Sequence, residues 1–206
     1  MFKNYLKTKS CLYISIMLLL SGCGGVSSKL GFDENSTSNF SELSEKEKET
    51  LNVLSTNQQK LLDAINKARS TEVTCGERGT FGPVHALTWN PNLYAAALEH
   101  VTDLAYSNTF SHEGSGTEYD ITGDGRPSKF YERIVANGYS DYYSVGENIA
   151  GGQRSLDNVM EAWMASPTHC ENIMKDTYTE IGIAIVIKSD SNYQVYWGQN
   201  FGSKRK

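Results

Sequence analysis

The stretch GENIAGG at residues 146–152 decides the fold of this chain. Its carboxylate, Glu147, lies between glycines and beside the apolar pair Ile149 and Ala150, in a stretch otherwise suited to a buried strand. Removing an unpaired carboxylate from water is costly, so a buried acid must find a charged or hydrogen-bonding partner. The stretch therefore predicts a strand whose acid is paired with another segment of the chain.

Two of the four histidines, His112 and His169, lie in segments bounded by Gly, Ser or Pro rather than inside apolar helix faces. Histidines in loops are better placed to line a cleft. A single histidine is more often a surface residue or a satisfied core residue. The functional interpretation of these two depends on their occurring together with Glu147.

Periodicity and capping signals predict several helices and a strand pair around this stretch. A Gly-, Ser- and Asp-rich loop is expected between Glu113 and Pro127. We predict helices from Ser44 with a restart at Thr56, from Asn90 to before Phe110, over 128–137 and over 155–165 with a short extension from Ser166, and a hairpin of strands at 178–187 and 193–201.

Four ordered segments, residues 110–112, 146–150, 162–174 and 178–184, resemble the motifs of the bacterial branch of the CAP superfamily (SCP/PR-1-like, cysteine-rich secretory protein family). The resemblance covers roughly Gln58 to Gly202. It implies an α+β fold, a three-layer α-β-α sandwich with an antiparallel sheet, and a central cleft in which histidines and acids converge.

Carried over by motif, His112, Glu147 and His169 would line that cleft, with Glu180 as the candidate for a second acid. The animal and plant branch places a histidine where this chain has Thr177. Two imidazoles with one or two carboxylates are suitable ligands for zinc or another divalent metal with an open position for water. The same groups could act without a metal as acid, base and orienting group.

The N-terminus has the order of a bacterial signal peptide, residues 1–22: a basic stretch, an apolar run over 11–20, and Ser21-Gly22 before Cys23. This last segment resembles a lipobox, which implies acylation of Cys23, with palmitate among the expected chains. The apolar run is shorter than the roughly 20 residues of a membrane-spanning helix. We therefore expect residues 23–44 to form a lipidated tether and 45–206 the folded domain. Gly24 favours the outer membrane or cell surface if the cell is Gram-negative.

Cysteine content and charge fit an exported protein. Cys11 leaves with the signal and Cys23 takes lipid, so Cys75 and Cys170 remain and are expected to form a disulfide in an oxidising compartment. After the signal peptide, 16 basic residues face 24 acidic ones, a balance of −8. A chain with this charge repels phosphate backbones at long range, so no nucleic-acid partner is expected.

The leading functional hypothesis is a membrane-anchored module that binds a lipid, a metal ion or an envelope component in its His/Glu cleft. A metal- or His/Glu-dependent hydrolase of the cell envelope is the alternative, and adhesion or host interaction through the outer surface is a third. Envelope polymers and extracellular proteins are further expected partners. The resemblance does not imply an enzyme, because a shared fold does not fix a shared activity.

Overall fold

A four-stranded sheet with the order β3-β5-β6-β4 forms the centre of the computed structural model, which describes residues 42–205. Its strands are β3 (Thr88–Trp89), β4 (Tyr142–Gly151), β5 (Glu180–Ile187) and β6 (Val195–Lys204). The three long strands are antiparallel, as predicted, whereas the short β3 runs parallel to β5. The sheet is therefore mixed at one edge, and β4 lies at the other.

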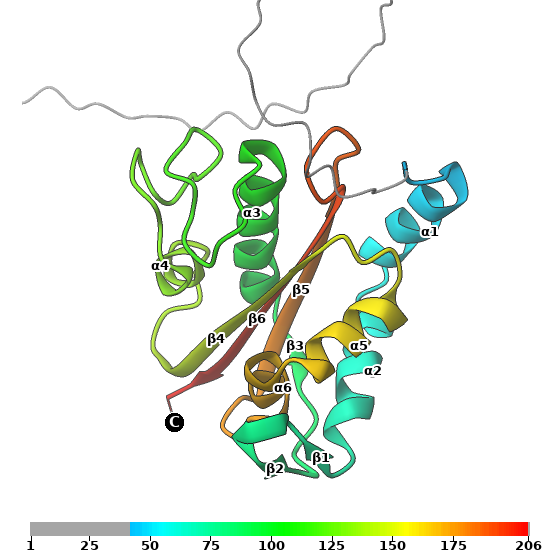
Figure 1. Ribbon diagram of the computed structural model, residues 1–206. Helices are drawn as coiled ribbons and strands as arrows, with labels where there is room; N and C mark the ends of the chain where they lie inside the picture. The colour runs from blue at the N-terminus through cyan, green and yellow to red at the C-terminus, as the bar shows by residue number, and fades with distance from the viewer. Residues whose placement is uncertain (1–41, 206) are drawn as a thin grey trace, which may run out of the picture. The chain divides into compact units, whose positions relative to one another are not determined.

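One face of the sheet is covered by α3 (Pro91–Ser107), with α4 (Phe130–Ala136) beside it (Figure 1). The Asn90 side chain accepts hydrogen bonds from the first turn of α3, and Pro91 starts the helix as predicted. A Cβ atom at Gly182 would collide with the α3 backbone at Tyr94. Glycine at this position lets α3 pack directly on β5, which fixes the depth of the residues that α3 carries.

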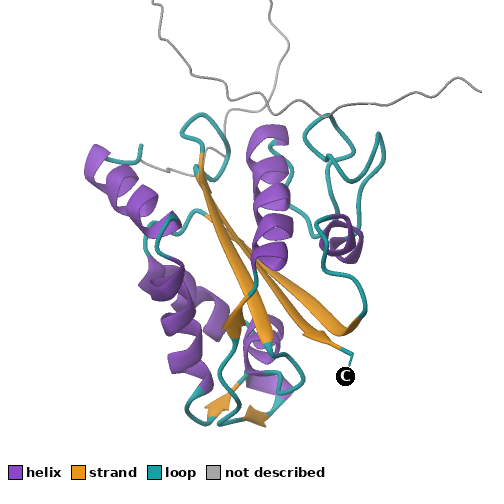
Figure 2. Cartoon of the chain, turned by 180° about the vertical axis from the view of Figure 1, so that it is seen from behind, coloured by secondary structure: helices purple, strands orange, loops and turns teal. Residues whose placement is uncertain are grey.

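The opposite face is covered by four helices: α1 (Glu45–Ser55), α2 (Gln58–Arg69), α5 (Leu156–Ala165) and α6 (Pro167–Met174). Figure 2 shows these helices and α3 on opposite sides of the sheet, which confirms the α-β-α sandwich. The capping box at Ser44 and the break after α1 agree with the predicted helix start and restart. Trp163 of α5 meets Trp197 of β6 edge to face, with 6.4 Å between the ring centroids, in the largest core cluster.

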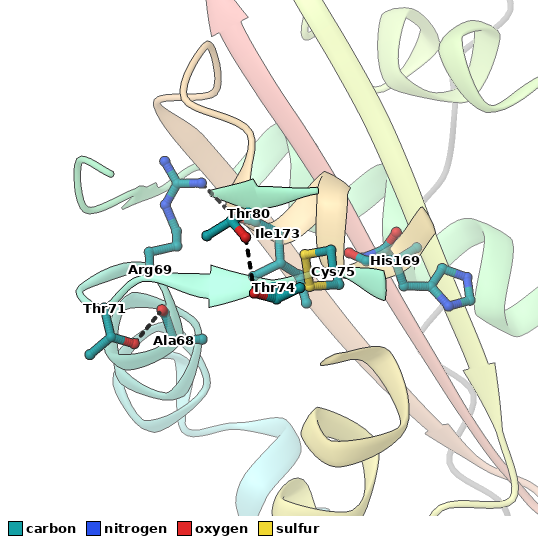
Figure 3. The surroundings of a disulfide bond; sticks show 10 residues. Ala68, Arg69, Thr71, Thr74, Cys75, Thr80, His169 and Ile173 are labelled. Carbon is teal, nitrogen blue, oxygen red and sulfur yellow. Dashed lines mark hydrogen bonds between the residues drawn. A yellow bond between two sulfur atoms is a disulfide. The ribbon is translucent and has the colours of Figure 1, made fainter. Parts of the chain in front are cut away.

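A small second sheet, β1 (Val73–Thr74) with β2 (Thr80–Phe81), encloses the 3-10 turn η1 (Gly76–Arg78). The predicted disulfide between Cys75 and Cys170 is confirmed, and it joins this ribbon to α6 with 5.5 Å between the Cα atoms (Figure 3). It closes a loop of 95 residues in sequence separation. By the chain-entropy model, a cross-link that closes a loop of this length stabilises the folded state by about 4.7 kcal/mol.

The described residues 42–205 form one compact unit. The predicted signal peptide, the acylation site Cys23 and most of the predicted tether lie outside them. Between residues 42 and 205, no helix is long and apolar enough to cross a bilayer.

Candidate functional site

Glu147 of β4 is the centre of the site, and its side chain is only 3% exposed. One carboxylate oxygen, Oε2, accepts a hydrogen bond from Arg133 Nη2 at 2.9 Å, and the other, Oε1, accepts from His112 Nδ1 at 2.9 Å. The Arg133 side chain is 1% exposed, so both members of this ion pair are out of water. Glu147 has the partner that its buried position requires.

Arg133 of α4 was not among the predicted site residues, yet it joins three segments. Its Nη1 donates to the backbone and side-chain oxygens of Ser128 at 3.0 and 2.9 Å. Its Nη2 donates to the backbone oxygen of His112 at 2.9 Å as well as to Glu147. The same guanidinium that neutralises Glu147 therefore also fixes the backbone of the segment that carries His112.

His100 of α3 is a second site residue that the sequence pattern does not predict. Its Nε2 lies 2.9 Å from the Ser111 carbonyl oxygen and 3.8 Å from Glu147 Oε1. A carbonyl only accepts, so the proton is on Nε2 and the ring donates. Burial lowers the pKa of His100 against the attraction of Glu147, which keeps the ring neutral near pH 7. We assign His100 as a positioning residue that holds the backbone next to His112.

The pKa of Glu147 is set by its burial and by the charged and hydrogen-bonding groups around it. Burial by itself raises the pKa of the carboxyl, but a protonated His100, the hydrogen bond from His112 and the charge of Arg133 outweigh it, and the pKa lies below the ordinary 4.5. Because His100 is neutral near pH 7, Arg133 is the cation that keeps Glu147 ionised there. Glu147 is therefore an anion that accepts hydrogen bonds rather than an acid that supplies a proton.

The two predicted histidines lie at the open side of the site. The His112 side chain is 54% exposed, and its Nδ1 is occupied by Glu147, which leaves Nε2 for a ligand or a proton. His169, on α6, is half-buried, and burial together with the charge of His112 lowers its pKa. Figure 3 shows the His169 ring directed away from the disulfide that its neighbour Cys170 makes. The structure thus places His112 in contact with Glu147, and His169 near enough to His112 for the two rings to interact electrostatically.

Two asparagines connect β4 to the helix that carries His169. Asn148 Nδ2 donates to the His169 carbonyl at 3.2 Å and to Gln199 Oε1 at 3.1 Å. Asn172 Nδ2 donates to the Glu147 carbonyl at 3.2 Å and to Asn148 Oδ1 at 3.0 Å. Gly146 lets the Tyr178 hydroxyl approach β4 and donate to the Val145 carbonyl at 3.2 Å, because a Cβ atom at residue 146 would collide with that hydroxyl.

Glu180 lies elsewhere. It begins β5, separated from β4 by β6, and accepts hydrogen bonds from Asn90 Nδ2 at 2.8 Å and from the Tyr139 hydroxyl at 2.6 Å. Burial and the hydrogen bond to Glu180 raise the pKa of Tyr139. Glu180 thus ties the start of α3 to the loop after α4 and makes no hydrogen bond with His112, Glu147 or His169.

An apolar groove of about 270 Å³ borders His169. The rings of Phe110 and Tyr193 meet at 4.7 Å between centroids along one wall, and Gly151 permits their approach because a Cβ atom there would overlap both. The groove is lined by Phe110, Ile149, Ala150, Gly151, Gln153, Ala162, Trp163, Ser166, His169 and Tyr193. Polar groups of the site therefore adjoin a mainly apolar surface.

A zinc site with Glu147 as ligand does not fit these residues. Both oxygens of Glu147 are engaged, one of them by the permanent cation Arg133. Within the described part of the chain, no group of three or more His, Cys, Asp or Glu side chains has a metal-binding arrangement. His112 and His169 alone offer two nitrogen donors, fewer than the three protein ligands of a catalytic zinc.

A three-layer sandwich with a His/Glu site at the edge of its sheet defines the class of CAP, or SCP-like, domains. Residues 62–201 match the cysteine-rich secretory protein family, and the chain belongs to that family.

Two curated relatives of Bacillus subtilis are similar in sequence. The uncharacterized protein YkwD is 29% identical over 178 residues, which cover 85% of this chain and 60% of YkwD. The uncharacterized membrane protein YlbC is 26% identical over 118 residues, covering 56% of this chain and 28% of YlbC. The chain therefore matches less than two thirds of the length of either relative.

Two solved structures share the fold. An extracellular SCP-domain protein of Bacillus anthracis has a TM-score of 0.55 at 22% identity, covering 72% of this chain and 40% of that one. An outer surface protein of Borrelia burgdorferi has a TM-score of 0.50 at 18% identity, covering 80% and 98%.

Replacing Arg133 by Met is expected to lower the free energy of unfolding by about 3–5 kcal/mol, because Glu147 is left buried without its cation. Since the folded-state pKa of Glu147 is below 4.5, the stability that this carboxylate contributes is complete above about pH 4.5 and is lost as the pH falls below it. Urea denaturation at pH 7 and along an acid series measures both effects.

The exposed pair Arg126–Glu132 provides a matched control, because Arg126 Nη2 lies 2.8 Å from Glu132 with the arginine side chain 59% exposed. Arg126→Met should cost no more than about 1 kcal/mol. The double variant Arg133→Met/Glu147→Leu should recover much of the loss. Equal losses for the two arginine variants would contradict the assigned role of the buried pair.

Proposed function

We propose that this chain is an exported, lipid-anchored CAP-domain protein that binds a small amphipathic ligand, with the apolar part of the ligand in the groove beside His169 and its polar end at His169 and His112. The observation that carries the proposal is the apolar groove with a half-buried imidazole at its border. Small-ligand sites commonly combine an apolar lining with a few convergent polar groups.

The size and charge of the site restrict the ligand. A groove of about 270 Å³ is slightly below the usual range of about 300–1,000 Å³, so it accommodates a short acyl or other apolar segment rather than a large ring system. The mature chain carries an excess of acidic residues, which disfavours polyanions at long range. A neutral or zwitterionic polar end that exchanges hydrogen bonds with imidazole fits best.

The proposed location rests on the N-terminal sequence. Signal-peptide order in residues 1–22 and the lipobox-like segment before Cys23 support export and acylation. The similarity in fold to proteins described as extracellular and as an outer surface protein agrees with export. A membrane anchor would keep the groove close to a source of amphipathic ligands.

Binding of a fluorescent fatty acid to the Phe40–Lys206 unit tests the proposed ligand class. Ala162 is exposed and lines the groove, so Ala162→Trp should fill the groove without disturbing the core and lower the affinity at least tenfold. His169→Ala should weaken binding about tenfold, which corresponds to about 1.4 kcal/mol. Fluorescence titration measures both effects.

Tyr143→Ala is the control, because Tyr143 is 70% exposed and is not part of the groove. Its affinity should equal that of the wild type. The ligand proposal is abandoned if the fatty acid fails to bind, or if all four proteins bind it equally.

A specific contact favours hydrolysis as the second candidate function. Glu147 holds Nδ1 of His112, so the exposed Nε2 is free to accept a proton from water while the resulting hydroxide attacks a carbonyl carbon. The imidazolium would then return that proton to the leaving group, and no metal is required. Loss of general-base catalysis of this kind typically costs 10²–10⁴-fold in rate.

Digestion of a peptide library separates this candidate from simple binding. If the chain is a hydrolase, Glu147→Gln and His112→Ala should each lose about 100-fold or more in rate, whereas His85→Ala, at an exposed histidine outside the site, should not. Circular dichroism checks that each variant is folded. If the folded Glu147→Gln variant keeps full activity, Glu147 is not needed to orient His112 for hydrolysis.

A further inference from the structure

We propose that a surface patch formed by Tyr106, Tyr119 and Ile121 rests on the lipid-water interface of the membrane that holds the anchor, and that it prefers zwitterionic lipid. This orientation depends on the lipid anchor that is part of the proposed function. The proposal concerns a surface outside the His/Glu site and assigns a defined orientation to the domain.

The three side chains of this interfacial patch are large and exposed. Ile121 is 76% exposed, Tyr106 48% and Tyr119 37%. The rings of Tyr106 and Tyr119 lie 5.4 Å apart between centroids, and Ile121 follows two residues after Tyr119. Tyrosine combines an apolar ring with a polar hydroxyl, which is why it is enriched where apolar and aqueous phases meet.

The patch is held rigidly by contacts on the side of Tyr106. Lys188 Nζ lies 5.3 Å from the centre of the Tyr106 ring and pairs with Asp190 at 2.6 Å. The Asn108 side chain accepts a hydrogen bond from the backbone of Asn192 at 2.8 Å. The end of α3 is therefore fastened to the β5–β6 turn, and little ordering entropy is lost when Tyr106 is buried.

The loop that carries Tyr119 and Ile121 is also fixed. Buried Asp120 accepts backbone hydrogen bonds from Gly116 at 3.1 Å and Ser128 at 2.8 Å, and the Thr122 backbone donates to Glu99 of α3 at 2.9 Å. The Asp120 carboxylate thereby connects the backbone at Gly116 to the backbone at Ser128, on either side of Tyr119 and Ile121. Ile121, between these two anchor points, is presented to the outside by a defined backbone.

The position of the patch relative to the chain start favours a membrane as its partner. The C-terminal end of α3, the loop that follows it and the β5–β6 turn lie at the same end of the sheet as the first described residues before α1 (Figures 1 and 2). Residues 24–41 separate Cys23 from that start, and 18 residues of chain reach at most about 65 Å. An anchor at Cys23 therefore limits how far that end of the domain can move from the bilayer.

Charge around the patch selects the lipid. Glu118 and Asp124, next to Tyr119 and Ile121 in sequence, are exposed, while the Lys188–Asp190 pair adds no net charge. An anionic bilayer surface would repel these carboxylates. Zwitterionic headgroups impose no such cost and still accommodate an isoleucine and two tyrosine rings at the interface.

Nitroxide labelling of the full-length acylated chain in phosphatidylcholine vesicles tests the proposal. A label on Ile121→Cys should become at least threefold less accessible to a water-soluble nickel relaxant when the chain is on vesicles, and replacing half the lipid by phosphatidylglycerol should reverse much of this protection. A label on Tyr143→Cys, at another highly exposed position, should remain fully accessible.

Flotation of the same samples reports on the anchor separately. If the chain floats with the vesicles and both labels remain in water, the anchor stands and the interfacial patch is wrong. If the chain does not float, the anchor and the orientation that depends on it both fail. Protection of the Ile121→Cys label without vesicles would indicate contact between protein molecules and would also overturn the proposal.

Discussion

The buried ion pair between Arg133 and Glu147 is the interaction on which the site depends. Two charges removed from water are tolerated only when they meet closely and their remaining hydrogen-bonding groups are used. Glu147 meets this condition through Arg133 and His112, each at 2.9 Å. Arg133 meets it in part, because its Nη1 and Nη2 also bind two carbonyl oxygens, whereas its buried Nε has no partner among the described residues. One pair thereby fastens α4, the segment around His112 and the edge strand β4 to one another.

The rest of the fold delivers groups to this pair from both faces of the sheet. On one face, the close packing of α3 at Gly182 sets the depth at which His100 reaches the Ser111 carbonyl. On the other face, α6 carries His169 and is held by Asn148, Asn172 and the disulfide. His112 is thus oriented before any ligand arrives, while His169 lies at the border of the apolar groove. Such preorganisation favours binding, and it is equally what a general base needs.

Sequence signals within a few residues predicted much of this arrangement. Contacts between distant parts of the chain could not be predicted in this way. Ser44 and Asn90 act through their own first helical turns, so their helix starts were predictable, and two remaining cysteines predicted one disulfide. Arg133 was missed because an arginine on a short helix is most often a surface residue, and only tertiary packing buries this one. His100 was missed because it lies within an apolar helix face. The position of Glu180 and the parallel pairing of β3 are set by partners far away in sequence, which a local sequence pattern does not reveal.

The central claim is that Glu147 holds the neutral His112 ring in one orientation and one tautomer. Nitrogen NMR of the imidazole rings at pH 8 tests it directly, because the protonated and unprotonated nitrogens of a neutral ring have distinct shifts. The structure predicts that His112 carries its proton on Nδ1, donated to Glu147, and that its Nε2 is unprotonated. A His112 ring protonated on Nε2, or averaged between the two forms as in free imidazole, would contradict this account.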